Sequence, residues 1–136
     1  MSQPQPFVSV VVPVRNGAET IEACIQSLLA QDYPRDRYEV LIINNGSSDD
    51  TARRARPYPV ILLHERRRFS SYAARNCGLQ AAHGEVIAFT DADCIAERSW
   101  LTQLVAGVED ASVGAFAGRV VSHQPVTVLE QFADRR

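Results

Sequence analysis

Apolar residues along the chain form two alternating patterns, short continuous runs and stripes with helical spacing. The runs are strand-sized and rich in β-branched residues, which is typical of strands buried on both faces of a sheet. We expect strands at residues 7–14, 40–43, 60–63 and 86–89, and a fifth extended run at 113–121. The first stripe consists of Ile21, Cys24, Ile25, Leu28 and Leu29, which places Cys24 in the core as a small apolar residue.

Residues that favour helix ends flank the stripes. Asn16, followed three residues later by Glu19, resembles a capping box and predicts that the first helix begins there. Ser70 or Ser71 suits the start of a later helix, and Gly84 is placed to end it. Further helices are expected at 51–56, with Asp49 available as its cap, after Ser99 up to Val108, and in the tail from Val126.

Strands that alternate with helices predict a Rossmann-like α/β fold, with a mostly parallel sheet flanked by helices. The length of 136 residues suits one domain, which we assign to residues 7–136 after a flexible lead-in at 1–6. Right-handed crossovers place the carboxyl ends of all parallel strands at one edge, and ligands of such sheets bind there.

Polar clusters follow the predicted strands at that edge. They are Arg15–Gly17, Asn44–Asp49, His64–Arg68 and Asp91–Asp93. Four clusters that converge on one edge indicate a binding site. The first strand is not followed by the GxGxxG pattern, which argues against a dinucleotide site.

Composition excludes several functions. All 14 basic residues are arginine, so a P-loop NTPase site and Schiff-base chemistry are both excluded. The net charge of −2 gives no indication of nucleic-acid binding. The apolar runs are too short to span a membrane, and the N-terminus lacks the basic region of a signal peptide. The three cysteines contain no CxxC pair, so we expect no zinc or disulfide framework, and a cytoplasmic location.

Asp91 and Asp93 follow the fourth strand directly. Because the two residues are two positions apart at the end of a strand, their side chains would point the same way and bring the two carboxylates together. The carboxylates would then repel each other unless a cation neutralises them. Carboxylate and phosphate oxygens suit Mg²⁺ or Mn²⁺. The alternative is a pair of solvated turn aspartates.

The other polar residues allow two interpretations each. The amides of the turn at Asn44–Ser47 could contact a nucleoside, or the turn could reflect turn-forming residues alone. The arginines at 66–68 could contact a diphosphate or form a solvated loop. Arg75 lies in a helical pattern and could turn inward. The histidines at 64, 83 and 123 are expected at the surface.

Four segments, in this order and spacing, resemble the nucleotide-sugar-binding half of a family 2 glycosyltransferase with the GT-A fold. They are VSVVVPVRNG at 8–17, YEVLIINNGSSDDT at 38–51, ARNCGL at 74–79 and GEVIAFTDAD at 84–93. The resemblance extends to about His123.

The resemblance implies a metal-dependent transfer of a sugar from a UDP- or GDP-linked donor to an unknown acceptor, with inversion at the anomeric carbon. It assigns nucleotide binding to Pro13, Val14, Arg15, Asn16, Asn44, Asn45, Gly46, Ser47, Arg75, Asp91 and Ala92. It assigns the Mg²⁺ or Mn²⁺ ion to Asp93, with Asp91 in the metal shell or at the ribose. Bound there, the ion would stabilise the leaving nucleoside diphosphate as a Lewis acid.

The sequence departs from the family pattern in two places. Asn44 and Asn45 stand where the family usually has at least one aspartate, which leaves the preferred base open. The chain also ends before the part that carries the acceptor site and the general base, and Glu130 and Asp134 look like surface residues. We therefore expect a truncated GT-A fold without an identified catalytic base. The alternatives are a non-catalytic nucleotide-binding module or an interaction protein with a vestigial site, and an exposed sheet edge could support a homodimer.

Overall fold

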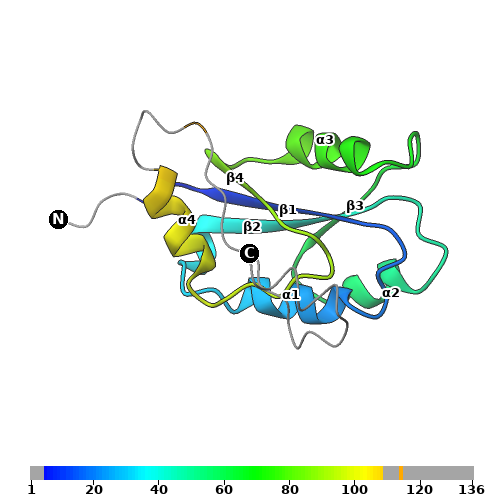
Figure 1. Cartoon of the computed structure of the whole chain (residues 1–136), viewed down its shortest axis with the longest axis horizontal. Coiled ribbons are helices and arrows are strands. Elements are labelled where there is room, and N and C mark those ends of the chain that lie inside the picture. The colour runs from blue at the N-terminus through cyan, green and yellow to red at the C-terminus, as the bar shows by residue number, and fades with distance from the viewer. Residues whose placement is uncertain (1–4, 109–113, 115–136) are drawn as a thin grey trace, which may run out of the picture.

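The computed structural model describes residues 5–108 and 114, and places a four-stranded parallel sheet between helices on both faces (Figure 1). The strand order is β3-β2-β1-β4. The elements are β1 (Val8–Val14), α1 (Ile21–Leu29), the 3₁₀ helix η1 (Arg35–Arg37), β2 (Tyr38–Asn44), α2 (Thr51–Ala55), β3 (Ile61–His64), α3 (Ser71–Ala81), β4 (Val86–Phe89) and α4 (Trp100–Val108). The α/β fold with a parallel sheet is confirmed.

The strands of the sheet differ in length at the edge where their carboxyl ends meet. β1 pairs with β2 along its whole length, but its pairing with β4 ends at Val11, opposite Phe89. β1 and β2 therefore continue beyond β4. The segment that follows β4 turns beside this extension, and the N–H of Thr90 donates to Val11 O at 3.3 Å.

The unequal lengths explain why a proline is tolerated inside the central strand. Proline lacks an N–H and is normally confined to sheet edges. Val14 O faces β2, where it accepts from Asn45 N, and Val11 O faces β4. Pro13 therefore faces the β4 side, beyond the end of that strand, and no ladder hydrogen bond is lost.

The two faces of the sheet are covered unequally. Helices α1, α2 and α4 pack on one face around fully buried residues such as Ile25, Leu28 and Leu101, each of which stabilises the fold by about 1.5–3 kcal/mol. Of the helices within residues 5–108, only α3 covers the other face, where Ala74 joins Val11, Leu41 and Ile43 (Figure 1).

Helix α3 lies very close to the sheet at one point. A Cβ atom added to Gly78 would lie 2.5 Å from Val11 Cγ1, so only glycine allows this approach. Beside α3, the side chains of Ile61, Leu79 and Phe89 are partly exposed. This second core is thinner than the first.

The start of α1 differs from the prediction. Asn16 does not cap the helix, which begins at Ile21 after Thr20, without a side-chain cap. Residues 17–20 form a turn in which Thr20 N and Ile21 N both donate to Gly17 O. The capping-box prediction is wrong because the Asn16 side chain bonds to a different loop, as described below.

Of the two predicted ends of helix α3, the start is confirmed and the end is wrong. Ser70 caps α3, because its hydroxyl accepts from Ala73 N at 3.1 Å. Gly84 does not end that helix; α3 stops at Ala81, and Gly84 N donates to Ser9 Oγ at 2.8 Å.

Several predictions concern the ends of the chain. The expected strand at 113–121 and helix from residue 126 lie outside the described residues, apart from residue 114. In the expected flexible lead-in, Gln5 O accepts from the Arg37 guanidinium, and Pro6 O accepts from the Tyr33 hydroxyl. Among the described residues, no helix has the length and hydropathy to cross a bilayer.

Candidate functional site

The loops that follow β1 and β2 are hydrogen-bonded to each other through Asn16. This residue has a left-handed backbone, with φ of 54°. Its N–H donates to Ser47 Oγ at 2.9 Å, and its Oδ1 accepts from Ser48 N at 2.8 Å. Asparagine tolerates this conformation better than most residues. Asn16 therefore fixes the position of one loop relative to the other.

Asp49 and Thr51 extend this connection to α2. Ala18 N donates to Asp49 Oδ2 at 3.1 Å, and Gly17 N donates to Thr51 Oγ1 at 3.0 Å. Asp49 Oδ1 accepts from Thr51 N at 3.0 Å, but Asp50 occupies the N-cap position of α2 and makes no side-chain cap hydrogen bond, so the prediction that Asp49 caps this helix is wrong. The hydrogen bond from the Thr51 hydroxyl is the main cause that lowers the pKa of Asp49; desolvation opposes it, and hydrogen bonds from backbone N–H groups lower the pKa further. Asp49 is therefore a carboxylate at neutral pH.

Asn44 and Asn45 join the β2 loop to the loop after β3. Their exposed fractions are only 7% and 4%. Asn45 Nδ2 donates to Arg68 O at 2.8 Å and to Glu65 O at 3.3 Å. Asn44 Oδ1 accepts from Ser47 N at 3.2 Å, while its Nδ2 lies 3.3 Å from His64 Nδ1. Both amides thus bond to the chain itself.

The loop after β3 also presents an aromatic ring to the site. The Arg15 guanidinium lies over the Phe69 ring, 5.0 Å from its centroid. The ring packs against Gly46, whose φ is +71° and where an added Cβ would lie 2.4 Å from Phe69 Cε1. Glycine at position 46 therefore permits both the turn and the contact that orients Arg15.

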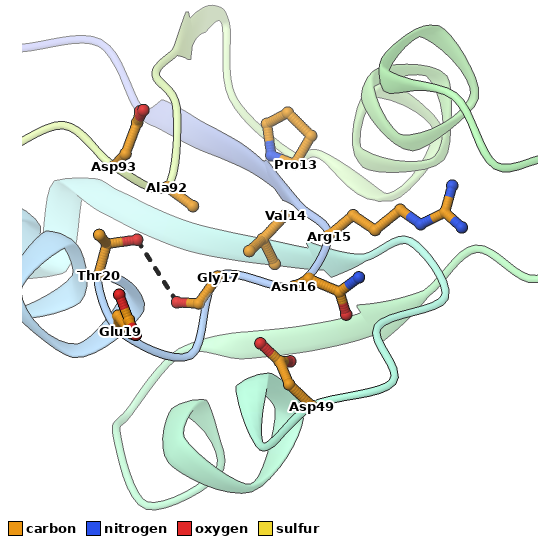
Figure 2. A pocket seen from close by; sticks show the side chains of 10 residues that line it. All are labelled: Pro13, Val14, Arg15, Asn16, Gly17, Glu19, Thr20, Asp49, Ala92 and Asp93. Atoms are coloured by element: carbon orange, nitrogen blue, oxygen red, sulfur yellow. Dashed lines mark hydrogen bonds between the residues drawn. The ribbon is translucent and has the colours of Figure 1, made fainter.

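A cleft of about 480 Å³ opens between the β1 loop and the turn after β4. Figure 2 shows Asp49 and Asp93 on opposite sides of it, with Arg15 extending away from Asp93 and Glu19. The cleft is lined by Pro13, Val14, Arg15, Asn16, Gly17, Glu19, Thr20, Asp49, Ala92 and Asp93. Its walls carry three carboxylates, and its one arginine points elsewhere.

Asp91 and Asp93 meet in a turn. Ala92 and Asp93 form the turn, which Cys94 N closes by donating to Asp91 O at 3.1 Å. The ligand atoms of Asp91, Asp93 and Cys94 all lie within 4.8 Å of one another. The sequence predicted that the carboxylates meet because they extend a strand, but the turn brings them together instead. Two exposed carboxylates at this separation fit a divalent cation such as Mg²⁺ or Mn²⁺.

Two neighbours surround this turn. Arg75 Nη2 on α3 lies 3.7 Å from Asp91 Oδ1. Arg75 is half-buried and Asp91 is exposed, so solvent screens this ion pair and its contribution to stability is small. The thiol of Cys24 donates to Asp91 O at 3.6 Å. Burial, and then the nearby Cys94 and the two aspartates, raise the pKa of Cys24 to about 12, so it remains a neutral thiol as expected of a core cysteine.

The arginine run lies in a different place. Arg67 and Arg68 line a second cleft of about 280 Å³, together with residues of α3 such as Tyr72 and Asn76. Glu65 Oε1 accepts from the backbone N–H of Arg67 at 2.7 Å, which shapes this loop. The described geometry does not bring these arginines into the cleft that Asp93 lines.

The predicted site residues fall into three groups. Those that line the first cleft are Pro13, Val14, Arg15, Asn16, Ala92 and Asp93. Those that hold the loops together are Asn44, Asn45, Gly46 and Ser47, and Arg75 with Asp91 forms an ion pair beside Asp93. Glu19 and Thr20 were missed, although their position just after the first polar cluster was a usable signal. Gly17 and Asp49 were included in the polar clusters at this edge, but neither of them was assigned a binding role.

Comparisons with known proteins give a consistent result. The model of the family "Glycosyl transferase family 2" matches residues 9–136. The glycosyltransferase AglE of Haloferax volcanii is 38% identical over 125 residues, which cover 88% of this chain and 41% of AglE. The chain thus spans about two fifths of that relative.

Two solved structures resemble the fold. The mannosyltransferase PcManGT of Pyrobaculum calidifontis, in complex with GDP-Man and Mn²⁺, has a TM-score of 0.75 and 35% identity over 82% of this chain and 34% of its own. Glucosyl-3-phosphoglycerate synthase of Mycobacterium tuberculosis, in complex with Mn²⁺, UDP and glucosyl-3-phosphoglycerate, has a TM-score of 0.64 and 26% identity over 76% of this chain and 39% of its own. The GT-A fold expected from the motifs is confirmed.

Proposed function

The chain belongs to glycosyl transferase family 2, and we propose that it is the donor-binding half of a metal-dependent enzyme that transfers a sugar from a nucleoside diphosphate. The observation that carries this proposal is the turn of Asp91 and Asp93. It lies at the carboxyl edge of the parallel sheet, beside a cleft built by the loops of β1 and β2. Ligands of open α/β sheets bind at this edge.

The charges around the cleft support the need for a cation. Glu19, Asp49 and Asp93 line the cleft, and a diphosphate is itself anionic. Without a counter-charge, the donor would be repelled. Because the chain contains no lysine, phosphate binding must rest on a metal ion, on backbone N–H groups and on arginines such as Arg75.

Asp93 and Asp91 would hold the ion, which we propose to be Mg²⁺ or Mn²⁺. Both solved structures described above contain Mn²⁺. This favours a divalent ion but does not decide between Mg²⁺ and Mn²⁺. When bound, the ion supplies Lewis-acid stabilisation of the departing diphosphate. Arg75, whose Nη2 lies 3.7 Å from Asp91 Oδ1, would add positive charge next to the same phosphates.

The nucleoside would occupy the first cleft, over the apolar surface of Val14 and Ala92. The buried amides of Asn44 and Asn45 are engaged with the chain, so we assign them to holding the loops rather than to direct contact with the base. One relative is in complex with GDP-Man and another with UDP, so guanine and uracil both remain candidates. An acceptor hydroxyl would attack from the face opposite the diphosphate, with inversion.

Titration calorimetry with UDP, GDP and their sugar conjugates, each with and without Mn²⁺, tests the proposal. We expect heat of binding only when the metal is present. No heat with any nucleotide under either condition would overturn it. Binding without donor hydrolysis or transfer, in a chain extended to the length of the relatives, would instead support a non-catalytic binding module.

The cytoplasmic location and the homodimer expected from the sequence stay predictions. The partly exposed Ile61, Leu79 and Phe89 on the α3 face give a second copy an apolar surface to cover. Light scattering that shows a monomer at all concentrations would exclude the homodimer.

A further inference from the structure

We infer that Cys94 is a third ligand of the ion held by Asp91 and Asp93, and that it allows this site to bind thiophilic divalent ions such as Zn²⁺. The inference deepens the proposed function and rests on it, because that function places a divalent ion at this turn. Asp91 and Asp93 alone form an oxygen-only site. Cys94, the next residue, adds a sulfur donor to the same cluster.

The separations within the cluster fit chelation of a single ion. Cys94 Sγ lies 3.7 Å from Asp93 Oδ1. In a tetrahedral zinc site, a sulfur about 2.3 Å and an oxygen about 2.1 Å from the metal are about 3.6 Å apart. The ligand atoms of all three residues lie within 4.8 Å, so small side-chain rotations would complete the site.

The backbone holds the thiol in this place. Cys94 N donates to Asp91 O at 3.1 Å, which fixes Cys94 against the residue that supplies another ligand. The same carbonyl oxygen accepts from the buried Cys24 thiol at 3.6 Å. This hydrogen bond connects the turn to α1. Cys94 itself is only partly buried, so an ion can reach its thiol.

The mixed donor set has a chemical consequence. Carboxylates suit Mg²⁺ and Mn²⁺, whereas a thiolate favours ions such as Zn²⁺, Co²⁺ and Cd²⁺. Binding such an ion would form one metal–sulfur bond and release the thiol proton to solvent. The site would then discriminate less strongly against Zn²⁺ than a site of two carboxylates does.

The other two cysteines of the chain provide a matched comparison. Cys24 is buried, and its thiol already donates to the backbone oxygen of Asp91, so it is not accessible to an ion from solvent. Cys77 lines the second cleft, on α3, with Arg67 and Arg68 among its neighbours there. Cys77→Ser therefore removes one partly exposed thiol without touching the turn.

Cobalt titration of the 136-residue chain, followed by absorption spectroscopy, tests the inference. We expect wild type and Cys77→Ser to develop the sulfur-to-cobalt charge-transfer band and Cys94→Ser to lack it. Zn²⁺ affinity should fall at least about 10-fold in Cys94→Ser. Mn²⁺ affinity, measured by electron paramagnetic resonance, should change less than about threefold, because Mn²⁺ prefers oxygen ligands.

Two results would overturn the inference: no such band in wild type, or the full band in Cys94→Ser. Cys94→Ala serves as a second variant, and circular dichroism checks that each variant is folded. A failure of the proposed function would give a different result from a failure of this inference. Nucleotides would then give no metal-dependent heat of binding in calorimetry, whether or not the cobalt band appears.

Discussion

Carboxylates at the two ends of the sheet have opposite surroundings. At the amino end, the Glu39 side chain is only 13% exposed. It accepts from Ser9 Oγ at 2.7 Å and from His83 N at 2.8 Å, and its other oxygen lies 3.2 Å from His83 Nδ1. At the carboxyl end, the Asp91 side chain is 66% exposed, and the nearest cation, on Arg75, is 3.7 Å away.

The difference separates a structural carboxylate from carboxylates that are available to a ligand. Glu39 has its charge satisfied by groups of the chain, and so ties α3 and β4 to the start of the sheet. Asp91 and Asp93 are both exposed, and we expect them to contribute little to folding. A charge that the fold leaves largely unpartnered, next to a cleft, is a candidate for ligand binding.

The largest expected effect is on binding. Asp93→Ala should abolish metal-dependent nucleotide binding, a loss of more than about 100-fold, since even outer-shell changes weaken metal sites by about 10- to 100-fold. Its free energy of unfolding should change by less than about 0.5 kcal/mol, because the side chain is exposed. Calorimetry with Mn²⁺ and urea unfolding measure the two quantities. If Asp93→Ala were strongly destabilised, Asp93 would have a structural role like that of Glu39, and the contrast between the two ends of the sheet would be wrong.

Asn45→Asp sharpens the comparison, because Asn45 lies at the carboxyl end but has a structural role. An aspartate there would place a buried charge against the carbonyl oxygens of Glu65 and Arg68. We expect a loss of about 3 kcal/mol in the free energy of unfolding.

Asn44→Asp is the matched control. Ser47 N would still donate to one carboxylate oxygen of the new aspartate, and His64 Nδ1 could donate a hydrogen bond to the other. Its cost should stay below about 1 kcal/mol. Equal costs in urea unfolding would mean that the Asn45 bonds are not what holds the loop.

Glu39→Gln should destabilise the fold less than Asn45→Asp does, by about 2 kcal/mol at pH 7, with nucleotide binding unchanged. Burial opposes ionisation of Glu39, but hydrogen bonds from His83 and Ser9 outweigh it and lower its pKa below the usual 4.5. The folded pKa is thus lower than the unfolded one. The stabilisation is present above about pH 4.5 and is lost as the pH falls through the lowered pKa.

Urea unfolding of wild type and Glu39→Gln between pH 3 and 7 measures this dependence. The difference between the two proteins should shrink toward acid pH. A difference that stays constant with pH would show that the charge of Glu39 does not stabilise the fold.

The strands were predictable because each is a continuous apolar run, and continuous runs mark strands covered on both faces. The start of α1 was not, because the partner of Asn16 is Ser48, 32 residues later, and local spacing cannot reveal it. For the same reason, local spacing could not predict that Asn45 bonds to Arg68 O.

The site was predictable as a location but not as a geometry. The polar clusters after parallel strands had to meet at one edge, which is why Asn16 and Asp93 line the same cleft. The end of β4 at Phe89 was predicted correctly, but not that Asp91 and Asp93 approach each other through a turn. The hydrogen bonds around that turn, from Thr90 N to Val11 O and from the Cys24 thiol to Asp91 O, join residues far apart in the sequence, so local spacing cannot reveal them.

The close approach of Gly78 to Val11 has a consequence for the charge of the site. Arg75 precedes Gly78 by about one helical turn, on the same side of α3. A methyl group at position 78 would push α3 outward, since its Cβ would lie 2.5 Å from Val11 Cγ1. The guanidinium would then move away from Asp91. A designer could therefore tune the surface potential around Asp91 by changing a buried residue, without altering any ionisable side chain.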